Sequence, residues 1–142
     1  MSGVDAAGAL ARAATLGPYF RWEPAESGAG WRPWRELADE EVVAERVRTA
    51  RTALAQRGGL SEDVLPERVV ASVTFLGYAA RAVSPLLAAA AMTGTFPIVA
   101  PADLWWRPVS GGPLPLAYTG AVPRPTPALS PRRSWRSRSA PC

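Results

Sequence analysis

The sequence contains no histidine, no lysine and only one cysteine. Without histidine the chain has no imidazole metal ligand, and it lacks the side chain that most often acts as a general acid or base. Its one cysteine, Cys142, can form no disulfide within the chain and no thiolate cage around a metal. The sequence also shows no glycine-rich phosphate loop and no nucleophile elbow. These absences exclude histidine catalysis and the common phosphate-loop and serine-nucleophile sites.

The positive charge is concentrated at one end of the chain. Residues 1–119 carry 11 Arg and all 12 acidic residues, which gives this part a net charge of −1. Residues 120–142 carry five Arg and no acidic residue. A claim of nucleic-acid binding from the net charge of +4 would therefore rest on the last 23 residues alone, and we expect no nucleic-acid partner.

One uncharged run is long enough to cross a membrane. Ala82–Ala102 has no charged residue over 21 positions, but Pro85, Gly94, Pro97 and Pro101 interrupt it and its Ala-rich centre is weakly hydrophobic. We expect buried helix and loop here, not a transmembrane segment. The N-terminus lacks a basic region before its apolar stretch, so we expect no secretory signal and a cytoplasmic protein.

The clearest local signal is a β-hairpin over residues 103–118. Two apolar arms, Leu104–Val109 and Leu114–Tyr118, flank Ser110-Gly111-Gly112-Pro113, a turn that tolerates positive φ. The arms contain Trp, Val, Leu and Tyr, which suit a half-buried strand. Three prolines limit the ladder, so we expect both arms to be edge-like: Pro108, Pro113 and Pro115.

The hairpin also supplies the candidate ligand-binding residues, Trp105, Trp106 and Arg107. The adjacent tryptophans face opposite sides of a strand, so one can anchor the core while the other lines a groove with Arg107. Such a groove could hold a flat anionic or aromatic ligand by charge and stacking. The alternative is that both tryptophans only pack. The amides of Ser110-Gly111-Gly112 could bind an anion, although a hairpin loop is the default interpretation of a single short glycine turn.

Two helices are predicted before residue 60. Val4–Leu16 is rich in strong helix formers, and Gly17-Pro18 ends it. Arg35–Arg57 carries acidic residues in its first half and Arg in its second, which complements the helix dipole, and Gly58-Gly59 ends it. Its apolar residues recur at spacings of four, three and four and so form one stripe: Val43, Val47, Ala50 and Leu54. Its acidic side chains are expected to be solvated, and without histidine we predict no metal site there.

The next helix is expected to begin at Asp63 as N-cap, with Pro66 in its first turn. The run Val69–Val83 is apolar almost all round, which predicts a helix that is buried on most sides. Pro85 should kink or end it, and Ser84 would cap a second helix through Met92.

Arg81 is the only charge in that long apolar stretch. If it is buried it needs a partner or faces a cavity, and the alternative is an arginine at the helix surface.

Aromatic residues cluster in the segment between the first two helices. Phe20 and Trp22 alternate as in a short extended segment. Trp31-Arg32-Pro33-Trp34 has the letters of a co-repressor-binding tag, but that tag ends its chain and this motif is internal. We expect the two tryptophans to pin the loop onto the body, with Pro33 fixing the backbone.

Gly120 is the expected boundary of the folded part. Pro123–Cys142 contains five Pro, five Arg and four Ser and has no apolar periodicity, so it cannot bury enough surface to order itself. The sequence therefore predicts a mainly α fold: a helical domain over residues 1–119 with a C-terminal β-hairpin, followed by a disordered tail over residues 120–142.

Several stretches carry a resemblance when they are taken in order: Leu16–Phe20, Trp31–Pro33, Ser72–Pro85, Leu104–Pro108 and Gly111–Pro113. Together they resemble the N-terminal half of actinobacterial FhuF-like ferric-siderophore reductases, which are (2Fe–2S)-binding proteins, over about residues 9–119. The resemblance implies release of iron from a siderophore by one-electron reduction, because siderophore oxygens hold Fe(III) more tightly than Fe(II). Its implied partners are a ferric siderophore and an electron donor. Because of their stacking and charge, we expect Trp105, Trp106 and Arg107 to be the residues that bind the ferric chelate.

The resemblance also implies a [2Fe–2S] cluster with four protein ligands, held in this family by a C-terminal Cys-Cys-x10-Cys-x2-Cys pattern. The sequence does not contain this pattern, and Cys142 alone cannot hold a cluster. A truncation or frameshift near Gly120 would explain both the missing cysteines and the composition of the tail. The chain would then be inactive in electron transfer. The alternative class is a non-enzymatic interaction or scaffold domain with a basic tail.

Overall fold

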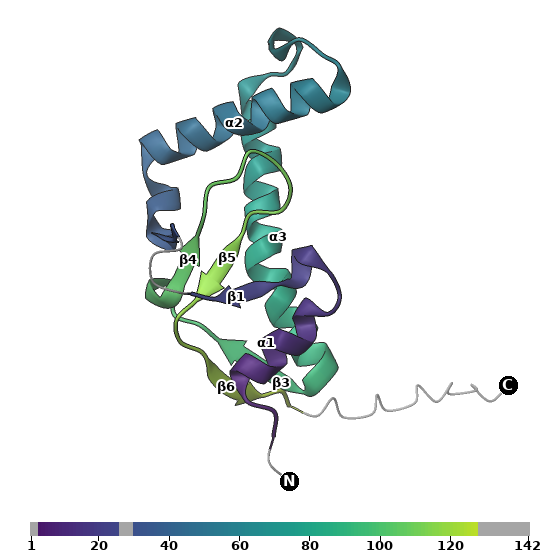
Figure 1. Ribbon diagram of the computed structural model, residues 1–142, viewed down its shortest axis with the longest axis vertical. Helices are drawn as coiled ribbons and strands as arrows, with labels where there is room; N and C mark the ends of the chain where they lie inside the picture. The colour runs from purple at the N-terminus through teal and green to yellow at the C-terminus, as the bar shows by residue number, and fades with distance from the viewer. Residues whose placement is uncertain (1–2, 26–29, 128–142) are drawn as a thin grey trace, which may run out of the picture.

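The computed structural model describes residues 3–25 and 30–127, which form three α-helices and two small sheets (Figure 1). The helices are α1 (Ala6–Ala14), α2 (Glu40–Gly58) and α3 (Glu67–Thr93). Helix α3 runs along most of the long axis of the molecule, α2 crosses its N-terminal half and α1 packs against its C-terminal half. The mainly helical fold with a hairpin toward the C-terminal side is confirmed. Four short 3₁₀ turns connect these elements: η1 (Pro18–Phe20), η2 (Trp34–Ala38), η3 (Glu62–Val64) and η4 (Pro101–Asp103).

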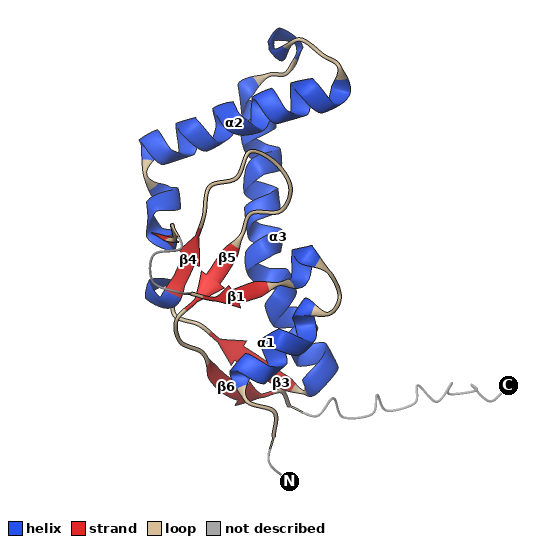
Figure 2. Ribbon diagram, viewed as in Figure 1, coloured by secondary structure: helices blue, strands red, loops and turns tan. Residues whose placement is uncertain are grey.

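The larger sheet has four short strands in the order β1-β5-β4-β2 (Figure 2). The predicted hairpin is its centre, with β4 (Leu104–Trp106) antiparallel to β5 (Leu116–Tyr118). Strand β1 (Trp22–Pro24) pairs in parallel with β5, and β2 (Arg32–Pro33) pairs antiparallel with β4. The expectation that both arms are edge-like is wrong, because the three prolines lie outside the paired segments and leave their ladders complete.

The smaller sheet joins β3 (Thr95–Ile98) to β6 (Val122–Pro125) in antiparallel register, with Phe96 opposite Arg124. Strand β6 lies beyond Gly120, so regular structure continues past the boundary that the composition predicts. All four residues of β6 are exposed, which is why apolar patterning gave no signal for it. The rest of the predicted tail, residues 128–142, lies outside the described residues.

The core lies between the larger sheet and the helices. Trp106 and Leu116 are fully buried and meet Leu10 of α1 and Trp22 of β1. Trp105, on the opposite face of β4, is half-buried, so the prediction that the two tryptophans face opposite sides is confirmed. The tag-like motif also packs as predicted, since Trp34 lies against this core and Trp31 stacks with Arg107.

Helix α3 continues through Pro85, and the predicted break with a second helix capped by Ser84 is wrong. Proline cannot donate to the carbonyl four residues earlier, which is that of Arg81. The indole Nε1 of Trp22 donates to this carbonyl at 2.9 Å instead. The side chain of Pro85 is itself fully buried. Tertiary contacts thus stabilise a helix that local propensity would interrupt.

The prediction that Val69–Val83 is buried on most sides is also wrong. Within this run Val70 and Arg81 are buried, whereas Val69, Val73 and Leu76 are at least half exposed. Only one side of α3 faces the rest of the molecule (Figure 1). By length and composition alone α3 would suit a membrane span, a property that core helices of soluble proteins share.

Other helix boundaries differ from the prediction. The segment 35–57 is divided, because Asp39 is extended and separates η2 from α2. Gly59 ends α2 at φ 61°, as expected for a glycine cap. Asp63 lies inside η3 instead of capping α3, which begins directly after Pro66. The buried side of α2 is rotated from the predicted stripe and consists of Val42, Arg46, Val47 and Ala55.

Candidate functional site

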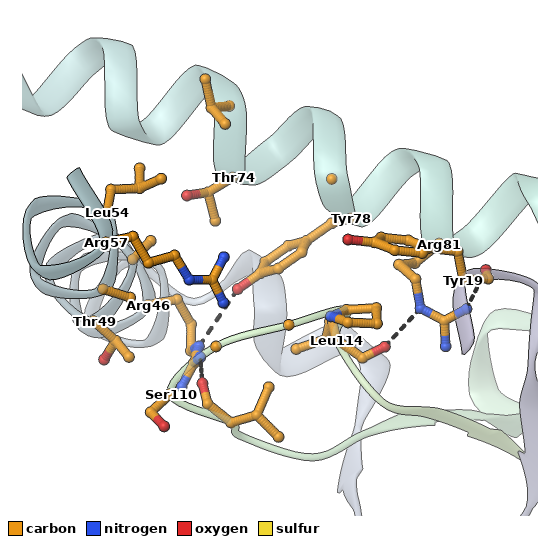
Figure 3. A pocket seen from close by; sticks show the side chains of 18 residues that line it. Tyr19, Arg46, Thr49, Leu54, Arg57, Thr74, Tyr78, Arg81, Ser110 and Leu114 are labelled. Atoms are coloured by element: carbon orange, nitrogen blue, oxygen red, sulfur yellow. Dashed lines mark hydrogen bonds between the residues drawn. The ribbon is translucent and has the colours of Figure 1, made fainter. Parts of the chain in front are cut away.

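A cleft of about 220 Å³ lies between α2, α3 and the loop of residues 109–114 (Figure 3). Helix α2 contributes small and apolar side chains such as Ala50, Ala53 and Leu54, and α3 contributes Val73 and the exposed backbone at Gly77. The Gly-rich hairpin loop covers the third side. The cleft forms where α2 crosses α3, near the N-terminal end of α3, and the loop of residues 109–114 extends from the sheet to close its third side.

Arg46 fixes the base of the cleft. Its side chain is buried, with 7% exposure, and its Nη2 donates to the carbonyl of Val109 while Nε lies 3.4 Å from the hydroxyl of Tyr78. The guanidinium also lies over the ring of Trp106, with its carbon 5.8 Å from the ring centroid. Arg46 therefore ties α2 both to α3 and to the start of the hairpin loop.

Arg57 lies at the mouth of the cleft and is exposed. Its guanidinium reaches over the hairpin loop, because a Cβ at Gly111 would lie 3.0 Å from Nη2. Among residues 3–25 and 30–127, Arg57 makes no hydrogen bond or ion pair. Figure 3 shows the guanidinium groups of Arg46 and Arg57 on the same side of the Tyr78 ring, facing the loop that carries Ser110.

Arg81 lies at the other end of the cleft and is 4% exposed. Of the two interpretations that the sequence left open, the buried arginine with partners is the one observed. Nε donates to the carbonyl of Leu114 at 2.8 Å, Nη2 donates to that of Arg21 at 2.6 Å, and Nη1 donates to that of Tyr19. Burial lowers the pKa of Arg81, and Glu23 and Tyr19 act in the opposite direction.

The cleft is suited to an anion that also has an apolar part. Three arginines line it, and none of the described residues that line it is acidic. The positive potential inside such a partly closed, low-dielectric space attracts negative charge. Of the three, only Arg57 is without a partner among the described residues and can turn its donors to a ligand. The alanines, Leu54 and Val73 offer apolar contact beside it.

The three candidate residues from the sequence do not form one surface. Trp105 is half-buried and its Nε1 donates to Thr119 Oγ1 at 3.3 Å. Trp106 is fully buried, with the guanidinium of Arg32 4.8 Å from its ring centroid. Arg107 stacks on Trp31 at 4.6 Å. Trp106 reaches the cleft only through its contact with Arg46, and none of the three lines it.

The sequence did not single out Arg46, Arg57 and Tyr78. One available signal was that Arg46 follows Val42 by one helical turn, so a charge lies in phase with a buried valine. Nothing local shows that the hairpin loop reaches α2. Its contact with Arg46 joins residues 63 positions apart in the chain.

Comparison of the chain with models of protein families, with curated proteins and with solved structures finds no match. Within residues 3–25 and 30–127 no group of three or more His, Cys, Asp or Glu side chains is arranged to hold a metal ion.

Proposed function

We propose that this chain binds an anionic ferric chelate, as the chelate-binding part of a ferric-siderophore reductase. The observation that carries the proposal is the cleft beside Arg57, which combines arginine side chains, apolar walls and no acidic lining residue. The resemblance of five stretches of the sequence to such reductases supplies the class of ligand, and the cleft supplies a place for it.

The chemistry of the ligand matches the cleft. A ferric catecholate complex has a negative charge and flat aromatic arms. A guanidinium can stack on such an arm and donate hydrogen bonds to the chelating oxygens. Apolar edges of the chelate would then lie against Leu54 and Val73. Arg46 and Arg81 already donate to backbone carbonyls, so their contribution is positive potential and a rigid frame.

The residues present do not fit a [2Fe–2S] cluster. Such a cluster needs four protein ligands, and the sequence has one cysteine and no histidine. No electron-transfer step can be derived from these side chains. The function that we propose for this chain is therefore binding of the chelate, with the electron supplied from elsewhere.

The test is titration of the full chain with a ferric catecholate complex, followed by tryptophan fluorescence and calorimetry. The gallium complex of the same chelator should bind equally well, because it has the same charge and similar size but is not reduced. Arg57→Gln should weaken binding at least about tenfold, since a hydrogen bond to a charged group is worth roughly 1.5–3 kcal/mol. Arg35→Gln, which removes an exposed charge on η2, is the matched control and should bind like the original chain.

Equal affinities for Arg57→Gln and the original chain would contradict a site in this cleft. If Trp105→Ala abolished binding while Arg57→Gln did not, the chelate would bind beside β4, at the residues that the sequence singled out. No binding of either metal complex would remove the proposed function altogether.

A further inference from the structure

Helix α3 carries an apolar stripe that none of the described residues covers. The stripe consists of Val69, Val73, Leu76, Ala80, Val83 and Leu87. Leu76 is 71% exposed, Leu87 58%, Val73 53%, Val69 50% and Val83 48%, and Ala80 is exposed as well. Buried residues lie on the opposite side of the helix, where α1, α2 and the sheet pack: Val70, Arg81, Pro85, Ala88 and Ala89.

The spacing of this stripe is that of a helix-pairing surface. Its members alternate at intervals of four and three residues, so they repeat every seven and stay on one side of the helix over five turns. From Val69 to Thr93 the only charged residue of α3 is Arg81, and its guanidinium is turned inward onto three carbonyls. Two such helices could therefore meet without bringing like charges together.

The exposed area of the stripe is comparable with the largest apolar patch of a typical monomer. The five large side chains of the stripe leave on the order of 500 Å² of apolar surface open, taking roughly 150–200 Å² for a fully exposed side chain of this size. The largest apolar patch of a typical monomer is about 300–600 Å² and is often functional. Two copies of this face would bury about 1,000 Å² with the alanines between, which is the lower limit expected of a biological interface.

We propose that this stripe is the interface of a homodimer in which α3 of two copies packs antiparallel. A twofold axis at the middle of the stripe places Leu76 of each copy opposite Ala80 of the other, so a large side chain meets a small one twice. The same register sets Val73 opposite Val83 and Val69 opposite Leu87. All six positions of one copy are then matched by the six of the second.

Two other occupants fit the stripe less well. Helices that lie on a membrane surface carry Lys or Arg along their polar boundary. The positions that flank this stripe are uncharged (Ser72, Ala79, Ser84 and Ala90), and Arg68 is the one basic residue at its start. The chain outside the described residues, 128–142, has four Arg and no apolar periodicity, so it does not complement an apolar stripe. The dimer proposal does not rest on chelate binding, although Val73 belongs both to the stripe and to the wall of the cleft.

Sedimentation equilibrium of the full chain tests the dimer. The original chain should sediment as a concentration-dependent dimer. Leu76→Glu should raise the dissociation constant at least tenfold, because it places two carboxylates at the centre of an apolar interface. Its circular dichroism should be unchanged, since this side chain is mostly exposed. Val64→Glu is the matched control: Val64 is 60% exposed but lies on η3, off the stripe, and its variant should dimerise normally.

A second variant distinguishes a specifically packed interface from nonspecific hydrophobic association. Ala80→Trp adds apolar surface, so it would strengthen nonspecific association or membrane binding, but in the proposed register its ring meets Leu76 and should weaken the dimer at least tenfold. A chain that is monomeric at all concentrations overturns the proposal. So does tighter association of the Ala80→Trp variant, or cosedimentation of the original monomeric chain with phosphatidylcholine–phosphatidylglycerol vesicles.

Discussion

Trp22 donates its indole N–H to the carbonyl of Arg81, the very carbonyl that Pro85 leaves without a helical donor. The two residues are 59 positions apart in the chain, and the bond is buried. It joins strand β1 to the middle of α3. A proline in the interior of a helix normally costs about 3 kcal/mol or more, partly through the lost hydrogen bond. Here a side chain from another element replaces that bond.

We therefore expect Trp22→Phe and Pro85→Ala to be energetically coupled. Trp22→Phe should destabilise the fold by about 1–3 kcal/mol, because it leaves a buried carbonyl unpaired. In the Pro85→Ala background the same change should cost less, since the new backbone N–H can donate to Arg81. A double-mutant cycle from urea unfolding measures the coupling. Strictly additive effects would show that the indole bond does not compensate for the proline.

Substitution of Arg81 should lower the stability of the fold more than substitution at most other positions. Arg81→Met removes the donors of three backbone carbonyls, so we expect a loss of at least about 3 kcal/mol in the free energy of unfolding. Arg81→Lys should restore only a small part of this, because an ammonium does not reproduce the planar fork of donors. Arg35→Met, at an exposed position, should stay within about 0.5 kcal/mol of the original chain. Equal melting temperatures for the Arg81 and Arg35 variants would contradict this account.

Stability should fall at alkaline pH through Tyr118. Burial raises the pKa of this phenol, and the nearby carboxylate of Asp5 raises it further. Since the folded chain holds the proton more tightly than the unfolded chain, this contribution is complete below the unfolded pKa of about 10 and is lost as the pH rises through the folded pKa. Urea unfolding at pH values below and above that pKa measures the slope of the free energy of unfolding against pH. Tyr118→Phe should flatten it, and an unchanged slope would assign the effect to other groups.

Substitution of two glycines by alanine should change the stability of the fold in opposite directions. Gly59 ends α2 with φ 61°, a conformation that costs an alanine about 1 kcal/mol, so Gly59→Ala should lower stability. Gly77 lies inside α3, and an added Cβ there meets nothing within 4 Å, so Gly77→Ala should raise stability by about 0.5–1 kcal/mol. Thermal unfolding of the pair provides an internal comparison. A gain for Gly59→Ala would be inconsistent with the left-handed cap.

Features with a local cause could be predicted from the sequence. Helix α1 forms within the predicted segment 4–16, although it ends at Ala14 with Thr15 as its cap, before Gly17-Pro18. Gly59 ends α2, and the Gly-rich loop between two apolar arms gives the β4–β5 hairpin. Alternation along a strand also correctly placed Trp105 and Trp106 on opposite faces. In each case the residues that decide the conformation are neighbours in the chain.

Features decided by distant residues could not be predicted. The helix continues past Pro85 because of Trp22, and β6 forms because β3 offers it an edge. The candidate cleft depends on a loop that reaches α2, and nothing in the sequence near Arg46 or Arg57 shows that contact. An apolar run such as Val69–Val83 also cannot show whether the body of the protein covers it.

The arginine in the middle of α3 has a consequence for the order of folding. Its guanidinium binds carbonyls 62, 60 and 33 positions away, on the N-terminal segment before β1 and at the approach to β5. The segments that precede β1 and β5 must therefore both reach the helix before this charge is satisfied, and such long closures come late in folding. Opening of either segment would leave the buried guanidinium without part of its hydrogen bonds, and this would weaken the attachment of the other segment to the helix. The first strand, the hairpin and the long helix should thus exchange their amide hydrogens as one cooperative unit.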